Sequence, residues 1–320
     1  MSTRLLDLMM REGGWRADTV KGCVPFIIDN VQQYMTQDMG SHYTWDDFPN
    51  LAPPFSRYWM EYESRAPHAP TPNRTYQMQS GVGVYVARIP EDNVQCLTES
   101  AQQGPQFQEQ LETFIATSDE AKWLLNFVLW DRRSDEPLQD DDPIVLIARM
   151  QVLVKADGSR ASTRVAMEVF DGSFNDPLPT SLLFAGLSPF LLATSFMHCK
   201  NVERVERVAP RHERKRAKRE GQLPLVTYKT LVIEPMTRVL HTEGGRGAGT
   251  NLKLAMHICR GHFKTFDEKP LFGKHRGMFF WNDQVRSKHS DRAVAKRDDV
   301  HPARDESGIA ITQSRPIGED

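Results

Sequence analysis

The feature that most constrains the fold is a run of 19 residues without a charged side chain, from Ser181 to Cys199 (SLLFAGLSPFLLATSFMHC). Such a run either crosses a membrane or lies buried inside a protein, and its length is near that of a membrane span. Pro189 stands in the middle, hydroxyl side chains are scattered through the run, and no aromatic belt flanks it. We therefore expect a central pair of buried helices, over 180–187 and 189–199, and no membrane contact.

Strand-like segments follow one another between residues 58 and 170. Residues 122–130 (KWLLNFVLW) are nearly all apolar, and residues 143–155 and 160–170 flank Asp157-Gly158, a strong hairpin signal. Runs of strands without β-α-β alternation are typical of α+β proteins. The sequence therefore predicts an α+β fold, with a mainly antiparallel sheet of about seven strands, N-terminal helices and the central buried helix pair.

The composition indicates one large folded unit. The chain has 320 residues, of which 39% are hydrophobic and 26% charged, so it can bury a sizeable core. We expect a single α+β domain over 1–285, with a helical N-terminal part over 1–45 because apolar residues between Val24 and Tyr34 repeat at helical spacing. Residues 286–320 carry many charges and almost no apolar side chains, so we expect a disordered charged tail.

Charge is distributed unevenly along the chain. The net charge is −2, which excludes a uniformly basic nucleic-acid-binding protein. Residues 1–150 nevertheless carry 12 Lys and Arg against 22 Asp and Glu, whereas residues 151–320 carry 28 against 20. This asymmetry indicates an anionic partner for the second half, a protein partner for the acidic first half, or contact between the two halves.

Cysteine usage indicates a reducing compartment. The chain has four cysteines and no CxxC pair, which is unlike a disulfide framework. Residues 1–16 are charged and lack the apolar segment of a secretory signal. We therefore expect a cytoplasmic protein.

The segment Asn251–Phe266 (NLKLAMHICRGHFKTF) predicts a strand with a cationic end. Alternate residues of a strand share a face, so Leu252 to Ile258 give an apolar face that continues as Arg260, His262 and Lys264. Three such donors on one face could follow a phosphate backbone or hold one anion. Arg260 and Lys264 could equally pair with carboxylates of the acidic first half.

A return strand follows directly, over 277–281. It and the preceding connection bring His275, Arg276 and Trp281 beside the cationic face, together with Phe279 and Phe280. Basic groups interleaved with aromatic rings suit nucleic-acid binding, with cations on phosphates and rings on bases. The alternative is a metal-independent nuclease or other phosphoryl-site enzyme, with His262 as the acid–base catalyst.

The densest basic stretch lies between Lys200 and Glu220, with nine Lys and Arg against four Glu. It contains no aromatic residue, so it would contact phosphates without reading bases. A solvated helix or loop is the alternative. The candidate phosphate contacts here are Arg214, Lys215, Arg216, Lys218 and Arg219.

Histidine and cysteine occur together at His257, Cys259 and His262. Zinc needs three or four such ligands that converge on one point, but on a strand His262 faces away from the other two. The chain also lacks the glycine-rich fingerprints of nucleotide-binding loops. We expect no metal ion and no cofactor.

Three stretches resemble uncharacterised proteins of bacteriophages and bacterial mobile elements. They are residues 196–202 (FMHCKNV), residues 215–221 (KRAKREG), and residues 257–264 (HICRGHFK) with 270–273 (PLFG). The resemblance covers about residues 196–282 and implies no activity. It implies a phage or mobile-element origin, and therefore the cytoplasm of a bacterial host cell.

The sequence thus predicts a nucleic-acid-binding accessory protein that uses its basic C-terminal half. Two alternatives stay open: the nuclease centred on His262, and a structural or partner-binding protein without catalysis. Whether the chain is an enzyme is not determined by its residues alone.

Overall fold

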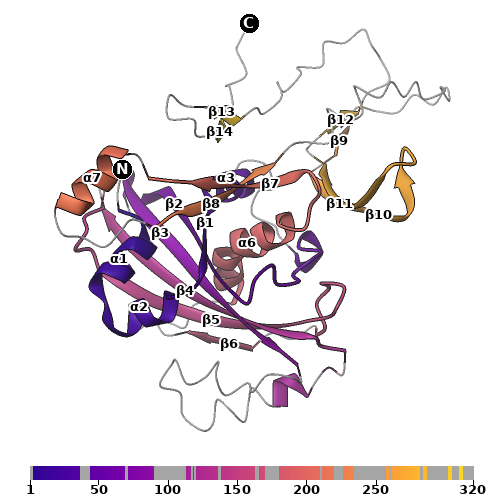
Figure 1. Cartoon of the computed structure of the whole chain (residues 1–320), viewed down its shortest axis with the longest axis horizontal. Coiled ribbons are helices and arrows are strands. Elements are labelled where there is room, and N and C mark those ends of the chain that lie inside the picture. The colour runs from indigo at the N-terminus through magenta and orange to yellow at the C-terminus, as the bar shows by residue number, and fades with distance from the viewer. Residues whose placement is uncertain are drawn as a thin grey trace, which may run out of the picture.

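The computed structural model describes residues 3–36, 44–68, 71–89, 113–116, 118, 120–135, 138–162, 166–169, 180–209, 211–219, 226–233, 257–259, 261–281, 284–286, 302–304 and 310–312. A large sheet with helices against both faces dominates this part of the chain (Figure 1). The α+β class predicted from the sequence is therefore present.

The main sheet has eight strands in the order β6-β5-β4-β3-β2-β1-β8-β7. Their bounds are Val24–Ile27 (β1), Arg57–His68 (β2), Thr71–Arg88 (β3), Trp123–Asp135 (β4), Ile144–Val154 (β5), Ala166–Val169 (β6), Val202–Arg207 (β7) and Tyr228–Ile233 (β8). From β2 to β6 each strand pairs antiparallel with the next, and β7 pairs antiparallel with β8. Asp157 and Gly158 form the turn after β5, where Gly158 has φ +88° and Val154 pairs with Arg160.

Strand β1 makes the sheet mixed, so the expectation of a mainly antiparallel sheet is wrong. β1 runs parallel to both neighbours, and its Phe26 pairs with Met60 of β2 and with Lys229 of β8. The ladder to β8 begins at Phe26, so the missing amide of Pro25 falls at the end of that ladder. A proline is therefore tolerated in a strand that lies between two others.

The helical N-terminal part predicted over 1–45 is only partly helical. Helices α1 (Leu5–Glu12) and α2 (Gly14–Val20) meet at Gly13, which has φ +71°. The following apolar repeat divides into β1 and the short helix α3 (Asp29–Tyr34). The apolar residues of β1 are buried by the neighbouring strands, and those of α3 are buried by the core. Together they imitate the spacing of one helix, so the pattern alone did not separate strand from helix.

One helix, α6 (Thr180–Phe196), replaces the predicted pair. It continues through Pro189, and the hydroxyl of Ser188 donates to the carbonyl of Phe184 at 2.7 Å. An interior proline costs a helix about 3 kcal/mol. Complete burial of Leu187, Phe190 and Leu191 against one face of the sheet offsets that cost.

The described helices include none that is both long and apolar enough to span a bilayer. The uncharged run is instead the centre of the larger of two cores, which contains residues of α6, β1, β2, β3, β4 and β5. The opposite face of the sheet packs against α1 and α2 in a second core that includes Leu5, Met9, Trp59 and Trp130.

The C-terminal half adds smaller elements. They are the helix α7 (Arg211–Arg219), the hairpin strands β10 (His262–Leu271) and β11 (His275–Trp281), the pair β9 (His257–Cys259) and β12 (Gln284–Arg286), and the pair β13 (Pro302–Arg304) and β14 (Ala310–Thr312). A single-turn 3-10 helix, η2 (Trp45–Asp47), precedes β2. Most of the predicted tail over 286–320 lies outside the described residues, so the boundary at 285 stays a prediction.

Candidate functional site

Helix α7 presents the densest group of predicted phosphate contacts. It carries Arg211, Arg214, Lys215, Arg216, Lys218 and Arg219, and each of these side chains is exposed. Arg214 donates from Nε to the backbone oxygen of Ala209 at 3.0 Å, which ties the first turns to the preceding loop. Three cations in the last turn interact favourably with the helix dipole. The six Lys and Arg side chains of α7 therefore all face solvent.

The hairpin β10–β11 is docked on the end of α6 through one face. Phe263 and Phe280 lie 5.3 Å and 4.8 Å, centroid to centroid, from the ring of Phe196. Asn201 fixes the return strand, because its side chain both donates to the oxygen of Phe280 and accepts from its amide, at 2.8 Å and 2.9 Å. The hairpin is therefore held firmly to the body.

The opposite face of the hairpin carries His262 and Lys264, both exposed. In the ladder His262 pairs with Trp281 and Lys264 with Phe279. The ammonium of Lys264 lies 5.1 Å from the centre of the Phe266 ring, a cation–π distance. Basic and aromatic residues thus alternate on this face, in the arrangement that the strand period predicts.

Trp281 is not available to stack on a base. Its side chain is 7% exposed, and its buried indole nitrogen has no hydrogen-bond partner in the part of the chain that the structure describes. It packs 6.5 Å from the ring of Phe266 in a small apolar cluster with Phe279 and Leu271. Of the residues predicted on this hairpin, His262 and Lys264 face solvent, whereas Trp281 packs into the fold.

The remaining predicted residues lie near the turn of the hairpin. Arg276 is exposed and donates from Nη1 to the backbone oxygen of Asp267 at 2.9 Å. His275 is half-buried with its ring 6.2 Å from that of Phe279. Arg260 lies outside the described residues, so its predicted place beside His262 stays a prediction.

The two basic elements do not form one continuous site. Figure 1 shows α7 and the hairpin β10–β11 at opposite ends of the molecule, with the sheet and α6 between them. A ligand that contacts both must therefore be extended. Small anions would contact one or the other.

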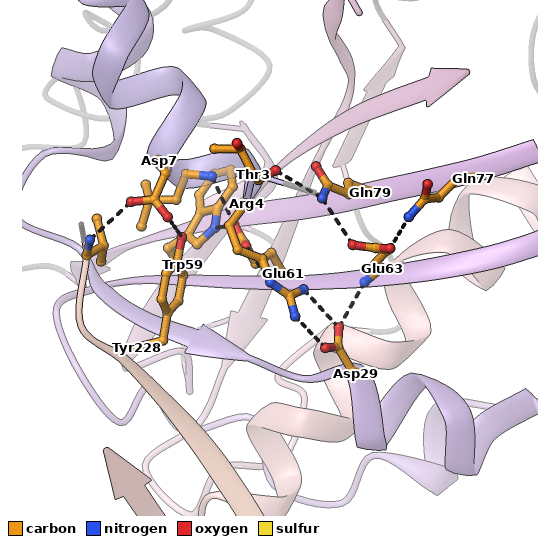
Figure 2. A network of polar contacts seen from close by, with 12 residues as sticks. Thr3, Arg4, Asp7, Asp29, Trp59, Glu61, Glu63, Gln77, Gln79 and Tyr228 are labelled. Atoms are coloured by element: carbon orange, nitrogen blue, oxygen red, sulfur yellow. Dashed lines mark hydrogen bonds and ion pairs between the residues drawn. The ribbon is translucent and has the colours of Figure 1, made fainter. Parts of the chain in front are cut away.

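A buried polar network under α1 is the most connected group of charges, and sequence reasoning missed it (Figure 2). At its centre the Glu61 side chain is 2% exposed, and its Oε2 accepts from the amide of Leu6 at 3.0 Å and the indole of Trp59 at 2.8 Å. Burial raises the pKa of Glu61 to about 7. The guanidinium of Arg4 opposes that rise, since its Nε lies 3.9 Å from Oε1 of Glu61.

Asp7 and Asp29 extend this network to other elements. Asp7 of α1 accepts from the amide of Val226 at 3.0 Å and the hydroxyl of Tyr228 at 3.3 Å, while burial raises the pKa of Asp7. Asp29 of α3 binds Arg4 through two hydrogen bonds of 2.7 Å and 3.2 Å and accepts from the amide of Glu63 at 2.9 Å. The network therefore joins α1, α3, β2 and the start of β8.

Glu63, Gln77 and Gln79 complete the network on β2 and β3. Glu63 accepts from the amide groups of both glutamines, and Gln79 also donates to the oxygen of Thr3 at 3.1 Å. A carboxyl with a pKa near neutrality is typical of acid–base catalysts. Glu61 is enclosed, however, so its contacts hold α1 on the sheet rather than meet a substrate.

Arg132 of β4 lies near this network and is completely buried. Its Nε and both Nη atoms find no hydrogen-bond partner among the described residues, and burial lowers the pKa of its guanidinium. The negative charges of Asp140, Asp142, Glu63 and Glu61 oppose this lowering only in part. An added anion would meet these carboxylates, so Arg132 is better understood as their counter-charge.

A visible signal for the network was the order Trp59-Met60-Glu61-Tyr62-Glu63 in a predicted strand. It places Glu61 on the same strand face as Trp59, and a charged residue on an apolar face needs a buried partner. The partners could not be identified, because Arg4, Asp7 and Tyr228 come from distant parts of the chain.

Comparisons with known proteins identify no relative of this chain. No family model matches the chain, and neither the curated proteins nor the solved structures include a match. Within the described residues, no three or more His, Cys, Asp or Glu side chains are grouped so as to hold a metal ion. The exposed basic elements are therefore the features that bear on function.

Proposed function

We propose that the protein binds nucleic acid through its basic C-terminal half, as an accessory protein of phage or mobile-element origin. The observation that carries the proposal is helix α7, which presents six Lys and Arg side chains to solvent within nine residues. The outer face of the β10–β11 hairpin adds His262, Lys264 and Arg276.

The physical argument begins with the repulsion among these cations. The side chains of α7 whose burial is described are all polar and exposed, so they give the protein body no apolar contact. A helix that is polar on every side gains little from packing, and like charges on successive turns destabilise it. A polyanion would remove that repulsion and would release the counterions condensed on its own phosphates.

The positions of the basic elements indicate an extended ligand. α7 and the hairpin lie apart in Figure 1. A nucleic-acid backbone could reach both of them, whereas a single phosphate could not. Their side chains contact phosphates, whereas the buried Trp281 takes no part in base contact. We therefore expect binding with little sequence preference and a steep dependence on salt.

Catalysis at His262 is the less supported alternative. His262 lies exposed on an open strand face, and acid–base cleavage of a phosphodiester is favoured by an enclosed site that positions both the acid and the base. Binding assays and cleavage gels on the same samples separate the two functions, because His262→Ala would abolish cleavage while leaving affinity nearly intact.

The proposal is tested by filter binding to single- and double-stranded DNA and RNA at several salt concentrations. Lys215→Ala/Lys218→Ala removes two proposed phosphate contacts, so we expect the slope of log K against log salt to fall by about 1.5. The matched control is Lys21→Ala/Arg57→Ala, which removes the same charge from exposed positions of the body. Equal effects of the two variants, or no salt-dependent binding by the wild type, would contradict the proposal.

A further inference from the structure

The tip of the β10–β11 hairpin has an unusual residue at its turn. Phe272 and Gly273 are the two central residues, with φ of +52° and +74°, and the amide of Lys274 donates to the oxygen of Leu271 at 3.1 Å. Two positive φ values are typical of the type I′ turn, which favours Asn or Gly at these positions. Among the described residues, Phe272 is the one non-glycine with positive φ.

Phe272 contributes little to the stability of the fold. Its side chain is 44% exposed, and its ring makes no aromatic pair with another described residue. An aromatic residue in the left-handed region carries steric strain that asparagine or glycine would relieve. Strained backbone of this kind is concentrated at functional sites.

The surroundings of Phe272 suit an anionic ligand with a flat, apolar face. Lys269 precedes the turn, Lys274 and Arg276 follow it, and all three are exposed. Two carboxylates, Asp267 and Glu268, stand nearer the base of the hairpin, where Arg276 donates to the backbone oxygen of Asp267. Phe272 therefore lies farther toward the tip than the carboxylates, with Lys274 two residues later in the same turn.

The base of the hairpin that carries the ring is fixed to the body. The docking of Phe263 and Phe280 on Phe196, and the two hydrogen bonds of Asn201, fix the base of the hairpin. The ladder between β10 and β11 runs from His262 and Trp281 to Phe266 and Gly277, and after a register shift it resumes at Leu271 and His275 beside the turn. A tip whose hairpin base is already ordered loses less conformational freedom on binding.

We infer that Phe272 stacks on a base of the bound nucleic acid, at an unpaired nucleotide or as a wedge between two base pairs, while Lys274 contacts an adjacent phosphate. The inference rests on the proposed function and assigns base contact to the hairpin tip. Nucleobases provide the flat π face that the geometry requires, and stacking on an aromatic side chain needs no particular sequence.

The test uses Phe272→Asn, since asparagine adopts the left-handed conformation without an aromatic ring. We expect this variant to melt at or above the wild-type temperature and to bind a single-stranded oligonucleotide about 10-fold more weakly. Its salt slope should be unchanged, because no charge is removed. Phe272→Trp should retain the affinity, and Trp15→Ala, which removes another exposed aromatic ring, should not lower it.

A second measurement reports on stacking itself. A 2-aminopurine base in the oligonucleotide changes its fluorescence when an aromatic ring stacks on it, and we expect wild type and Phe272→Trp, but not Phe272→Asn, to produce that change. If Phe272→Asn matches the wild type in affinity and fluorescence while Lys215→Ala/Lys218→Ala binds weakly, the inference is wrong and the proposed function stands. If the wild type binds no oligonucleotide, both are wrong.

A membrane surface is the competing occupant of an exposed aromatic tip with adjacent lysines. Vesicles of phosphatidylcholine and phosphatidylglycerol provide the probe, and we expect wild type and Phe272→Asn to sediment equally with them. Loss of vesicle binding in Phe272→Asn, with unchanged oligonucleotide affinity, would overturn base stacking in favour of membrane contact.

Discussion

Charged side chains lie in different environments in the body and in the C-terminal elements. Around α1 and β2 the charges are paired and partly or fully buried: Arg4 binds Asp29 at 2.7 Å, and the buried Glu61 accepts from the amide of Leu6. On α7 the charges are exposed and concentrated in one sign. The difference teaches that part of the negative charge of the first half lies inside the fold, whereas the positive charge of α7 is exposed to solvent.

This difference also limits the protein-partner hypothesis for the acidic half. Asp7 and Glu61 contribute to the negative count of residues 1–150, yet both are buried in the network under α1. Exposed carboxylates such as Asp141 remain for a partner. A surface interaction through the first half would therefore use fewer charges than the sequence count indicates.

The largest effect is expected from the core around α6. Phe190 is completely buried and lies 5.3 Å from the ring of Tyr62, so Phe190→Ala should lower the free energy of unfolding by about 3–5 kcal/mol. Phe190→Asp should prevent accumulation of folded protein, because it buries an unpaired charge. Urea unfolding measures the first, with exposed Val208→Ala as a control; a loss below 1 kcal/mol would show that α6 is not central to the core.

The buried network should give a pH-dependent effect of the next size. Because burial raises the pKa of Glu61 from 4.5 to about 7, the folded state binds a proton that the unfolded state has released between these pH values. The contribution of Glu61 to the free energy of unfolding therefore falls as pH rises from 4.5 to 7, by on the order of 3 kcal/mol. Glu61→Gln should remove this slope.

The measurement is the difference in unfolding free energy between wild type and Glu61→Gln from pH 5 to 8. Taking the difference cancels other groups, including His198, whose pKa is lowered by burial and which acts in the opposite direction. We expect the difference to shift in favour of the variant as pH rises. Exposed Asp18→Asn is the control, and a pH-independent difference for Glu61→Gln would mean that Glu61 does not change its protonation in this range.

Alanine substitutions at two glycines compare how tightly side chains pack on the two faces of the sheet. A methyl group on Gly81 would collide with the Trp59 ring and lie 2.9 Å from Leu5, so Gly81→Ala should cost about 1–3 kcal/mol and disturb the Trp59–Glu61 hydrogen bond. Gly186→Ala is the matched control, since the nearest atom lies 3.9 Å away and alanine favours the helix. Thermal unfolding of both variants checks this, and equal destabilisation would contradict the packing described.

Helix α7 should show the smallest effect on stability. Lys215→Ala/Lys218→Ala removes exposed side chains, and such substitutions usually change the free energy of unfolding by no more than about 0.5 kcal/mol. A larger loss in urea unfolding would show that these lysines support the fold, and the affinity change of this variant could then not be assigned to phosphate contacts.

The strands of the antiparallel part of the sheet could be predicted from sequence, because the residue patterns that specify them lie within short segments of the chain. The apolar runs of β4 and β5 and the Asp157-Gly158 turn have patterns that are complete within about ten residues. Likewise, the strand period places His262 and Lys264 on one exposed face of β10.

Features that depend on distant partners could not be predicted. β1 becomes a strand because β8, about 200 residues later, pairs with it, and α6 remains one helix because burial outweighs the cost of Pro189. Asp7 finds Val226 and Tyr228 across more than 200 residues. The strain at Phe272 depends on a backbone angle that residue patterns do not specify.

The most direct test compares amide hydrogen exchange with and without a bound oligonucleotide. We expect binding to slow exchange in α7 and in the β10–β11 hairpin, including the turn at Phe272, and to leave β2, β3 and β4 unchanged. Protection confined to the sheet or to α1 and α2, with no change in α7 and the hairpin, would contradict nucleic-acid binding through the exposed basic elements.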